Sequence, residues 1–433
     1  MEFFLRSPER PKIIVSDDDI ALLHDYKSRF KSDFEILAPT KMQDQLSKQE
    51  GARQSIFLRA PGIQYSHPLI KAALQFDYFV TTFSGWWISQ HSERVAATVT
   101  GTKGKSTTSH LLAKLLTACG IKAKAVGNIG DLPCAEDGGD VKYVYELSSY
   151  HLHDLPKAVS LHLLTNIFDE HLDWHGGRKN YIDAKCRPAT LDPNTTVILS
   201  KNFLEHTAKR VVRRVLVEDW VSIEGNEIKA RDPNRPSEKT SSTTLRDGLL
   251  QHPATASAAA FAAVGAMLVC QCDSSSLLSK LSVILESGIE LQSRHRVIGM
   301  VMDRTFVDDT LATIPEATVA SLYAWNDDRI HLILGGKDRG QNHSLLLQYL
   351  SENKTRVKAY VYGPTAKVLC NDKNLTKECD SLKDAVTSAF GCSVPGDVIM
   401  FSPAAASHET GTDYIVRSAD FADIMLKLNT EMD

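Results

Sequence analysis

The chain has 433 residues, of which 43% are hydrophobic and 24% charged, and its 49 Lys+Arg and 53 Asp+Glu give a formal net charge of −4. These values exclude a disordered chain, and they give no basic excess of the kind that marks many nucleic-acid-binding proteins. Even the most apolar stretch, residues 254–270, is shorter than the ~20 residues that a membrane span needs. The eight cysteines lack zinc-type spacing, and the first residues lack the apolar core of a signal peptide. We therefore expect a cytoplasmic protein with reduced cysteines and, at roughly 100–200 residues per domain, about three domains.

The first unit, residues 1–93, is predicted to be a small α/β domain. Short apolar runs at 13–15, 55–58 and 78–81 are separated by helical patterns, which suggests parallel strands. A complete Rossmann domain would begin with a strand leading into a Gly-rich turn, and no such turn precedes Ile13. We therefore expect the front of this domain to be shortened.

The second unit, residues 94–296, begins with a strand at 95–99 that runs into a glycine-rich turn. A helix follows, with leucines on one face, and Gly120 is its predicted stop. Later elements are predicted as buried strands at 143–145 and 161–167, an exposed loop at 232–244 and an alanine-rich helix at 254–270.

The third unit, residues 297–433, alternates apolar runs with helical patterns. A hairpin is predicted at 297–307, and buried strands at 330–334, 357–362 and 398–401 each end at small or turn-forming residues. This alternation indicates a doubly wound sheet, which binds its ligands at the carboxyl ends of the strands.

The clearest functional signal is the segment Thr100-Gly-Thr-Lys-Gly-Lys-Ser-Thr107 between a strand and a helix. Glycines let backbone N–H groups crowd around phosphate oxygens, and the helix N-terminus adds positive potential. Lys105 would reach the β/γ-phosphates, and Ser106 or Thr107 would bind Mg²⁺. Val99 stands where a full Walker A motif has its first glycine. We predict a nucleotide site here, and a purely structural glycine turn is the alternative.

Acidic and histidine side chains follow the next two predicted strands. Glu146 would lie at the sheet's carboxyl edge beside the phosphate loop, where an acid can hold a Mg²⁺ that bridges phosphates; the alternative is a solvated acid at a strand end. Residues 165–175 bring an imidazole and several carboxylates to one strand end, which suits a second metal site. Lys185, taken alone, is typical of a solvated lysine on a helix.

Eight motifs occur in an order that resembles the Mur ligases over nearly the whole chain. They are Thr100–Thr107, Glu146–Ser149, Asn166–Asp173, Tyr181–Lys185, His295-Arg296, Asp308–Thr310, Gly335–Gly340 and Ser402–Ser407. The resemblance is strongest to the type that adds glutamate to UDP-N-acetylmuramoyl-L-alanine, and the wording of 101–107 and 311–315 resembles a branch that adds L-glutamate. The implied fold is α/β with three domains: a shortened Rossmann-like acceptor domain at 1–93, a P-loop-type ATPase domain at 94–296 and a Rossmann-like glutamate-binding domain at 297–433.

The resemblance also implies a reaction, made with ATP in the synthesis of peptidoglycan precursors. ATP phosphorylates a substrate carboxylate, and the amine of the incoming amino acid attacks the acyl phosphate to give an amide, ADP and phosphate. Two Mg²⁺ ions and a lysine suit the crowded anions of such a step. The small-molecule partners would be ATP, glutamate and UDP-N-acetylmuramoyl-L-alanine or a related carboxylate, with no nucleic acid or membrane partner, and the enzyme would be a monomer.

By resemblance, each motif residue receives a role. The implied catalytic residues are Lys105, Glu146, His171 and Lys185. ATP would be held by Gly101, Thr102, Lys103, Gly104, Lys105, Ser106 and Thr107, and from the third domain by Arg296 and Asp309. Mg²⁺ would be held by Ser106, Glu146 and His171, and by Lys185 in the carbamylated form found in this family. Substrate contacts are implied for Asn128, Ser148, His151, Thr313, Arg339, Ser407 and Tyr414.

Three departures from the family pattern affect recognition rather than catalysis. The glycine-rich turn that holds the UDP diphosphate is absent before Ile13, and His151 stands where a glutamine is usual. Pro253 and Ala256 replace two asparagines that contact adenine in the family. Two alternatives therefore stand beside the glutamate ligase: a Mur-like ligase for a different carboxylate acceptor, and a catalytically weak Mur-like scaffold or regulatory subunit.

Overall fold

The computed structural model of the chain divides into two compact units, and each is described by itself. The first comprises residues 1–222, 228–243 and 257–284, and the second comprises 223–227, 244–256 and 285–433. The structure describes residues 12–17, 23–24, 27–28, 34–48, 55–129, 132–133, 137–237, 239–245, 250, 253–286, 296–323, 325, 328–337, 341–370, 375–407 and 414–430.

The N-terminal part of the first unit contains two small parallel strand pairs. β1 (Ile14–Val15) pairs with β2 (Glu35–Ile36), and β3 (Ile56–Leu58) pairs with β4 (Phe79–Thr81). These confirm the strands predicted from the three apolar runs, while the predicted shortened front of the domain falls on residues 1–11, outside the described residues. The helices here are α3 (Pro39–Lys48), α4 (Pro68–Gln75) and α5 (Phe83–Gln90), followed by the 3₁₀ turn η2 (Ser92–Arg94).

A six-stranded, wholly parallel sheet forms the centre of the first unit. Its order is β10-β9-β8-β5-β7-β6, so β5 lies between β7 and β8. Parallel strands end at one edge, so the residues that follow β5, β7 and β8 come together there. The strands are β5 (Val95–Thr100), β6 (Ala123–Gly127), β7 (Lys142–Glu146), β8 (Leu161–Leu164), β9 (Thr196–Leu199) and β10 (Arg214–Leu216).

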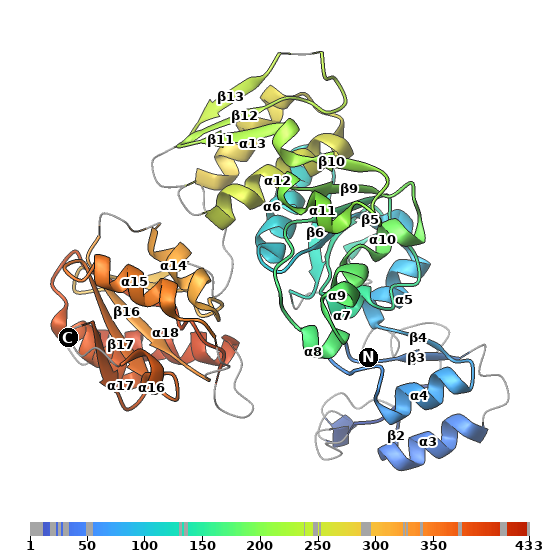
Figure 1. Cartoon of the computed structure of the whole chain (residues 1–433), viewed down its shortest axis with the longest axis horizontal. Helices are drawn as coiled ribbons and strands as arrows, with labels where there is room; N and C mark the ends of the chain where they lie inside the picture. Colours follow the sequence, from blue (N-terminus) through green and yellow to red (C-terminus); the bar gives the residue numbers. More distant parts are fainter. Residues whose placement is uncertain are drawn as a thin grey trace. The chain divides into compact units, whose positions relative to one another are not determined.

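Helices flank this sheet, as Figure 1 shows. α12 packs tightly, because a Cβ added at its Gly265 would touch Leu112 of α6 and Leu163 of β8 at 3.3–3.5 Å. On α5, Trp87 packs with Tyr143 and Tyr145 of β7 in another buried cluster. The helices are α6 (Lys105–Ala118), α7 (Ser149–Leu152), α8 (Leu172–His175), α9 (Arg178–Lys185), α10 (Arg187–Leu191), α11 (Leu204–Thr207), α12 (Pro253–Cys270) and α13 (Ser274–Glu286), with 3₁₀ turns η4 (Lys201–Phe203) and η5 (Val217–Asp219).

Two predictions for the middle of the chain need correction. The strand expected at 161–167 ends at Leu164, because the following residues fold back over the loop after β5. The exposed loop expected at 232–244 contains a buried aspartate, Asp232, and ends in a strand. That strand completes a small sheet made of β11 (Val221–Glu224), β12 (Glu227–Ala230) and β13 (Ser241–Thr244).

The second unit contains the predicted doubly wound sheet, in the order β14-β15-β19-β16-β17-β18. Only β14 is antiparallel to its neighbour. Successive residues of β16 point to opposite faces of the sheet and so to different cores. Leu332 packs with α14 and α15, and Ile333 packs with α17 and α18. The elements are β14 (Arg296–Val301), β15 (Arg304–Asp308), α14 (Pro315–Tyr323), β16 (Ile330–Gly335), α15 (Ser344–Glu352), β17 (Val357–Tyr362), α16 (Ala366–Leu369), β18 (Thr376–Cys379), α17 (Leu382–Cys392), β19 (Val398–Phe401) and α18 (Tyr414–Thr430).

The seven cysteines in the described ranges are free thiols, and the sulfurs of Cys119 and Cys272 are 3.9 Å apart. No helix in the described ranges combines the length and the apolar character required to cross a bilayer.

Candidate active site

The glycine-rich loop between β5 and α6 depends on one close approach, at Gly101, and on one left-handed backbone conformation, at Gly104. A Cβ at Gly101 would lie 1.9 Å from the Thr165 hydroxyl, so only glycine fits there. Gly104 has a φ of 78° and precedes the first residue of α6, Lys105. The loop therefore ends at a helix N-terminus, whose backbone N–H groups and dipole favour a bound anion.

Two residues that follow β8 form hydrogen bonds to the backbone of this loop. The side-chain oxygen of Asn166 accepts hydrogen bonds from the backbone N–H groups of Thr102 at 2.9 Å and Lys103 at 2.8 Å. Its amide nitrogen donates to the Lys103 carbonyl at 2.9 Å, and the Thr165 hydroxyl donates to the same carbonyl at 2.8 Å. The loop is thus held in one conformation before any phosphate arrives.

Three lysines come from the loop and from α9. Lys105 donates to the Thr102 carbonyl at 3.0 Å, and Lys103 pairs with Glu170 at 3.0 Å. Lys185 is 1% exposed, and its Nζ donates to the Gly101 carbonyl at 2.8 Å. Burial, reinforced by the charge of Lys105, lowers the pKa of Lys185 well below its ordinary value. Lys185 is therefore a buried amine at the loop and not the solvated helix lysine that its local sequence suggests.

Glu146, the last residue of β7, presents a buried carboxylate at the same edge. Asn128, which follows β6, donates to its Oε1 at 3.1 Å. The Oε2 atom of Glu146 is buried and has no hydrogen-bond partner among the residues that the structure describes. A buried carboxylate oxygen without a partner is costly, and a bound cation would satisfy it.

The short helix α7 follows Glu146, and two predicted substrate residues lie at its N-cap and within it. The Ser148 hydroxyl and the His151 Nδ1 lie 2.7 Å apart. Burial, with a smaller contribution from Arg59, lowers the pKa of His151 to about 4, so its ring is neutral at pH 7. Tyr150 lies between these two residues in the sequence, and the centroid of its ring is 4.8 Å from that of the His171 ring.

His171 has a left-handed backbone (φ 57°) at the start of α8 and keeps a partly exposed ring. Burial lowers its pKa, although the neighbouring Glu170 opposes the shift. A neutral imidazole is the form that binds a metal. The ring is therefore available as a metal ligand.

In the second unit, the predicted residues that the structure describes follow β15 or β19, lie on β14 or begin α18. Asp309 is buried and accepts hydrogen bonds from Ser321 at 2.7 Å and Ser402 at 2.6 Å. Arg296 is exposed on β14, and the Thr313 carbonyl accepts from Gln341 at 2.8 Å. Ser407 is half-buried beyond β19, and Tyr414 begins α18. Arg339 lies outside the described residues.

The chain is similar to known proteins both in its middle part and over most of its length. Residues 99–214 match the Mur ligase middle domain. The UDP-N-acetylmuramoyl-L-alanine--L-glutamate ligase of Salinispora tropica is 30% identical over 398 residues, which cover 86% of this chain and 83% of that protein. The chain belongs to the Mur ligase family. Its membership confirms the predicted enzyme class, an ATP-dependent amide ligase.

Other relatives of this Mur ligase differ in the glutamate named. The UDP-N-acetylmuramoylalanine--D-glutamate ligase of Oenococcus oeni is 29% identical, over 88% of each chain. Among solved structures, UDP-N-acetylmuramate-alanine ligase MurC from Thermotoga maritima has a TM-score of 0.57 at 15% identity, covering 96% of this chain and 99% of its own. The likeness confirms the predicted α/β fold.

Within the first unit of this ligase, the predicted residues gather at one sheet edge. These are residues 101–107 with Asn128, Glu146, Ser148, His151, His171 and Lys185. Residues 165–175 were predicted to lie at the site, but the hydrogen bonds of Thr165 and Asn166 to the glycine-rich loop were not predicted. Arg59 was missed because nothing in its local sequence indicates its distant partners.

Proposed function

We propose that this ligase joins glutamate to UDP-N-acetylmuramoyl-L-alanine, using ATP and Mg²⁺ through an acyl phosphate. The observation that carries the proposal is the combination of a clamped phosphate loop with a buried carboxylate oxygen, Glu146 Oε2, that lacks a hydrogen-bond partner among the described residues. We take the identity of the acceptor and of the amino acid from the names of the relatives.

The residues present fit a Mg²⁺ ion that is completed by phosphate. Within the described ranges, no three acidic, histidine or cysteine side chains converge to hold a metal by themselves. Mg²⁺ is commonly held by one or two carboxylates together with substrate phosphates and water. We assign Ser106 and Glu146 to a first ion and His171 to a second. Bound Mg²⁺ would neutralise the phosphate charge that develops during transfer.

Lys185 suits carbamylation because a neutral amine, and not an ammonium, attacks carbon dioxide. Its burial and lowered pKa favour that neutral form. The neutral amine forms an N–C bond with carbon dioxide and releases one proton, which leaves a carbamate anion whose oxygen atoms can bind a metal. The new charge would lie beside Lys105, whose own charge contributes to the pKa shift.

In the proposed reaction, the acceptor's carboxylate oxygen attacks the γ-phosphorus, and ADP leaves. The loop N–H groups and Lys105 hold the phosphates, which fixes the line of attack. The glutamate amine then attacks the acyl carbon; the tetrahedral intermediate expels phosphate, and the amine loses a proton. Ser148, His151 and Asn128 would hold the acceptor.

The second unit would supply the remaining binding groups. We assign Arg296 and Asp309 to the nucleotide, and Thr313, Arg339, Ser407 and Tyr414 to glutamate, whose carboxylates suit a guanidinium and hydroxyls. L-glutamate is the proposed amino acid, because residues 311–315 resemble that branch and the relatives from Salinispora tropica and Micromonospora carry its name. Because the reaction uses ATP and a nucleotide-linked acceptor, we expect it in the cytoplasm, and we expect a monomer in gel filtration.

Phosphate release tests the proposal. The purified protein is incubated with ATP, Mg²⁺, L- or D-glutamate, and either UDP-N-acetylmuramoyl-L-alanine or a folyl carboxylate. The expected result is release that requires both glutamate and the sugar-peptide acceptor. Release only with the folyl carboxylate would favour the ligase for another acceptor, and no acceptor-dependent release would favour the scaffold. Lys179→Ala, an exposed lysine on the same helix as Lys185, is the matched control for Lys185→Ala.

A further inference from the structure

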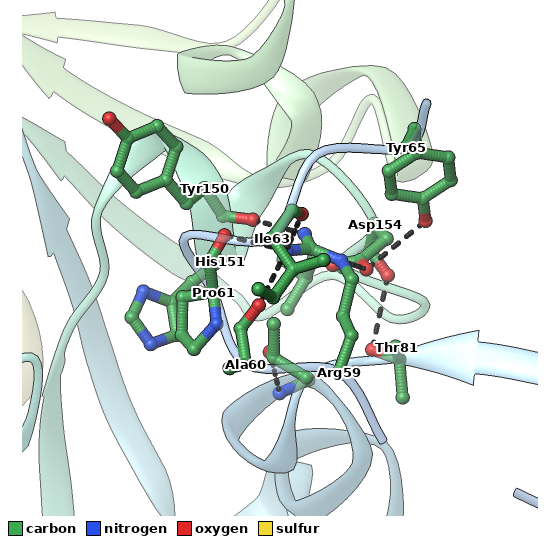
Figure 2. Close-up of polar contacts among 12 residues, drawn as sticks. Arg59, Ala60, Pro61, Ile63, Tyr65, Thr81, Tyr150, His151 and Asp154 are labelled. Carbon is green, nitrogen blue, oxygen red and sulfur yellow. Dashed lines mark hydrogen bonds and ion pairs between the residues drawn. The ribbon is translucent and has the colours of Figure 1, made fainter. Parts of the chain in front are cut away.

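Arg59 connects the loop after β3 to the helix α7 and is almost completely buried. Its side chain is 1% exposed. It donates within its own loop to the carbonyls of Ala60, Pro61 and Ile63, at 3.3, 2.7 and 3.3 Å. Figure 2 shows the guanidinium enclosed by these groups. The arginine thereby closes the turn formed by residues 60–63.

The same guanidinium also binds two groups from the α7 segment. Its Nε donates to Asp154 at 2.6 Å, and its second terminal nitrogen donates to the Tyr150 carbonyl at 2.6 Å (Figure 2). Tyr65, from the same loop, donates its hydroxyl to Asp154 at 3.1 Å. A planar fork can serve several acceptors at fixed angles, which a lysine cannot do.

A second hydrogen bond joins the turn to α8, the short helix that begins after His171. The Trp174 indole donates to the Gly62 carbonyl at 2.9 Å. The Trp174 and Tyr150 rings are 4.7 Å apart, and the Tyr150 ring lies 4.8 Å from that of His171. A Cβ added at Gly62 would meet nothing within 4 Å, so this side of the turn is open.

We infer that Arg59 is a positioning residue that fixes the turn at 60–63 against α7, and that the turn and α7 together form part of the binding site for the acceptor. The inference rests on the proposed function, because α7 carries Ser148 and His151, the residues assigned to the acceptor. The side chain of Arg59 is 1% exposed and its three guanidinium nitrogens all donate to groups of the turn, Asp154 or Tyr150, so it acts through the turn and the Tyr150 carbonyl. Nucleotide binding, which uses the loop after β5, does not depend on it.

Two conservative variants test this role. Arg59→Lys keeps the charge but cannot reach Asp154 and the Tyr150 carbonyl together. Trp174→Phe keeps an aromatic ring but removes the bond to Gly62. The matched control is Lys122→Ala, which breaks an exposed ion pair with Asp140. For each protein we would measure the KM values for acceptor and ATP, the Kd for ADP, and amide hydrogen exchange at residues 60–65.

The expected result is a KM for the acceptor at least tenfold higher in both variants, with the KM for ATP and the Kd for ADP within twofold of the wild type. Exchange at 60–65 should also be at least tenfold faster, and the control should change none of these values. An unchanged acceptor KM in folded Arg59→Lys and Trp174→Phe would overturn the inference, as would an equal rise in both KM values. A wild type inactive on every acceptor would contradict the proposed function instead, whereas faster exchange in Arg59→Lys would still support the fixing of the turn by Arg59.

Discussion

Replacing Asn166 by alanine should loosen the phosphate loop without unfolding the domain. The change removes three side-chain hydrogen bonds, to the N–H groups of Thr102 and Lys103 and the carbonyl of Lys103. At about 1 kcal/mol for each bond, the total is about 3 kcal/mol. The backbone bond from Thr102 N–H to the Asn166 carbonyl, at 3.2 Å, stays in place and keeps the loop attached to the strand end.

The free energy of the lost hydrogen bonds should appear partly as a lower free energy of unfolding and partly as a weaker affinity for ADP. If half of it appears in binding, the affinity for ADP with Mg²⁺ falls about tenfold, since about 1.4 kcal/mol corresponds to a factor of ten. Calorimetric titration with ADP measures the affinity, and urea unfolding measures the stability. Asn194→Ala, at an exposed loop position, is the control. An Asn166→Ala protein that binds ADP as tightly as the wild type would refute the idea that Asn166 preorganises the loop.

Three further predictions concern the same sheet. Lys185→Ala should reduce the ligation rate by about 100-fold or more, the scale for loss of one preorganised charge, and short-chain carboxylic acids should partly restore it; a normal rate without them would contradict the assigned role. Glu146→Gln should raise the Mg²⁺ concentration for half-maximal activity at least about tenfold, and an unchanged Mg²⁺ dependence would remove Glu146 from the metal site. Burial lowers the pKa of His162 to about 4 from an ordinary value of 6.5, so the unfolded chain takes up this proton first and stability is lost as the pH falls between these values. Between pH 7 and 5.5, His162→Gln should reduce the loss of unfolding free energy by roughly 1 kcal/mol in urea titrations, and an equal loss in both proteins would contradict this.

Local patterns were sufficient for the strand, the glycine-rich loop and the helix that begin the central sheet. The strand at 95–100 and the helix from Lys105 follow from an apolar run, a glycine turn and a helical leucine face. The position of Glu146 beside them follows from parallel topology, because β7 neighbours β5.

The contacts between distant segments could not be read from the sequence. Arg59 and Asp154 are 95 residues apart, and only the packed fold shows that their side chains form a buried ion pair. The burial of Lys185 could not be predicted for the same reason, because its hydrogen bond to the Gly101 carbonyl joins residues 84 positions apart. The strand at 241–244 was missed because its serine and threonine run resembles a loop, although it pairs within a small sheet.

The central claim is that ATP activates the acceptor's carboxylate as an acyl phosphate before glutamate is added. The most direct test uses UDP-N-acetylmuramoyl-L-alanine whose carboxylate carries two ¹⁸O atoms, with ATP, Mg²⁺ and L-glutamate. Mass spectrometry of the products should find one ¹⁸O atom in each phosphate released and the other in the new amide. Phosphate without ¹⁸O, formed together with the glutamate adduct, would contradict the acyl phosphate, and the absence of any adduct would contradict the ligase itself.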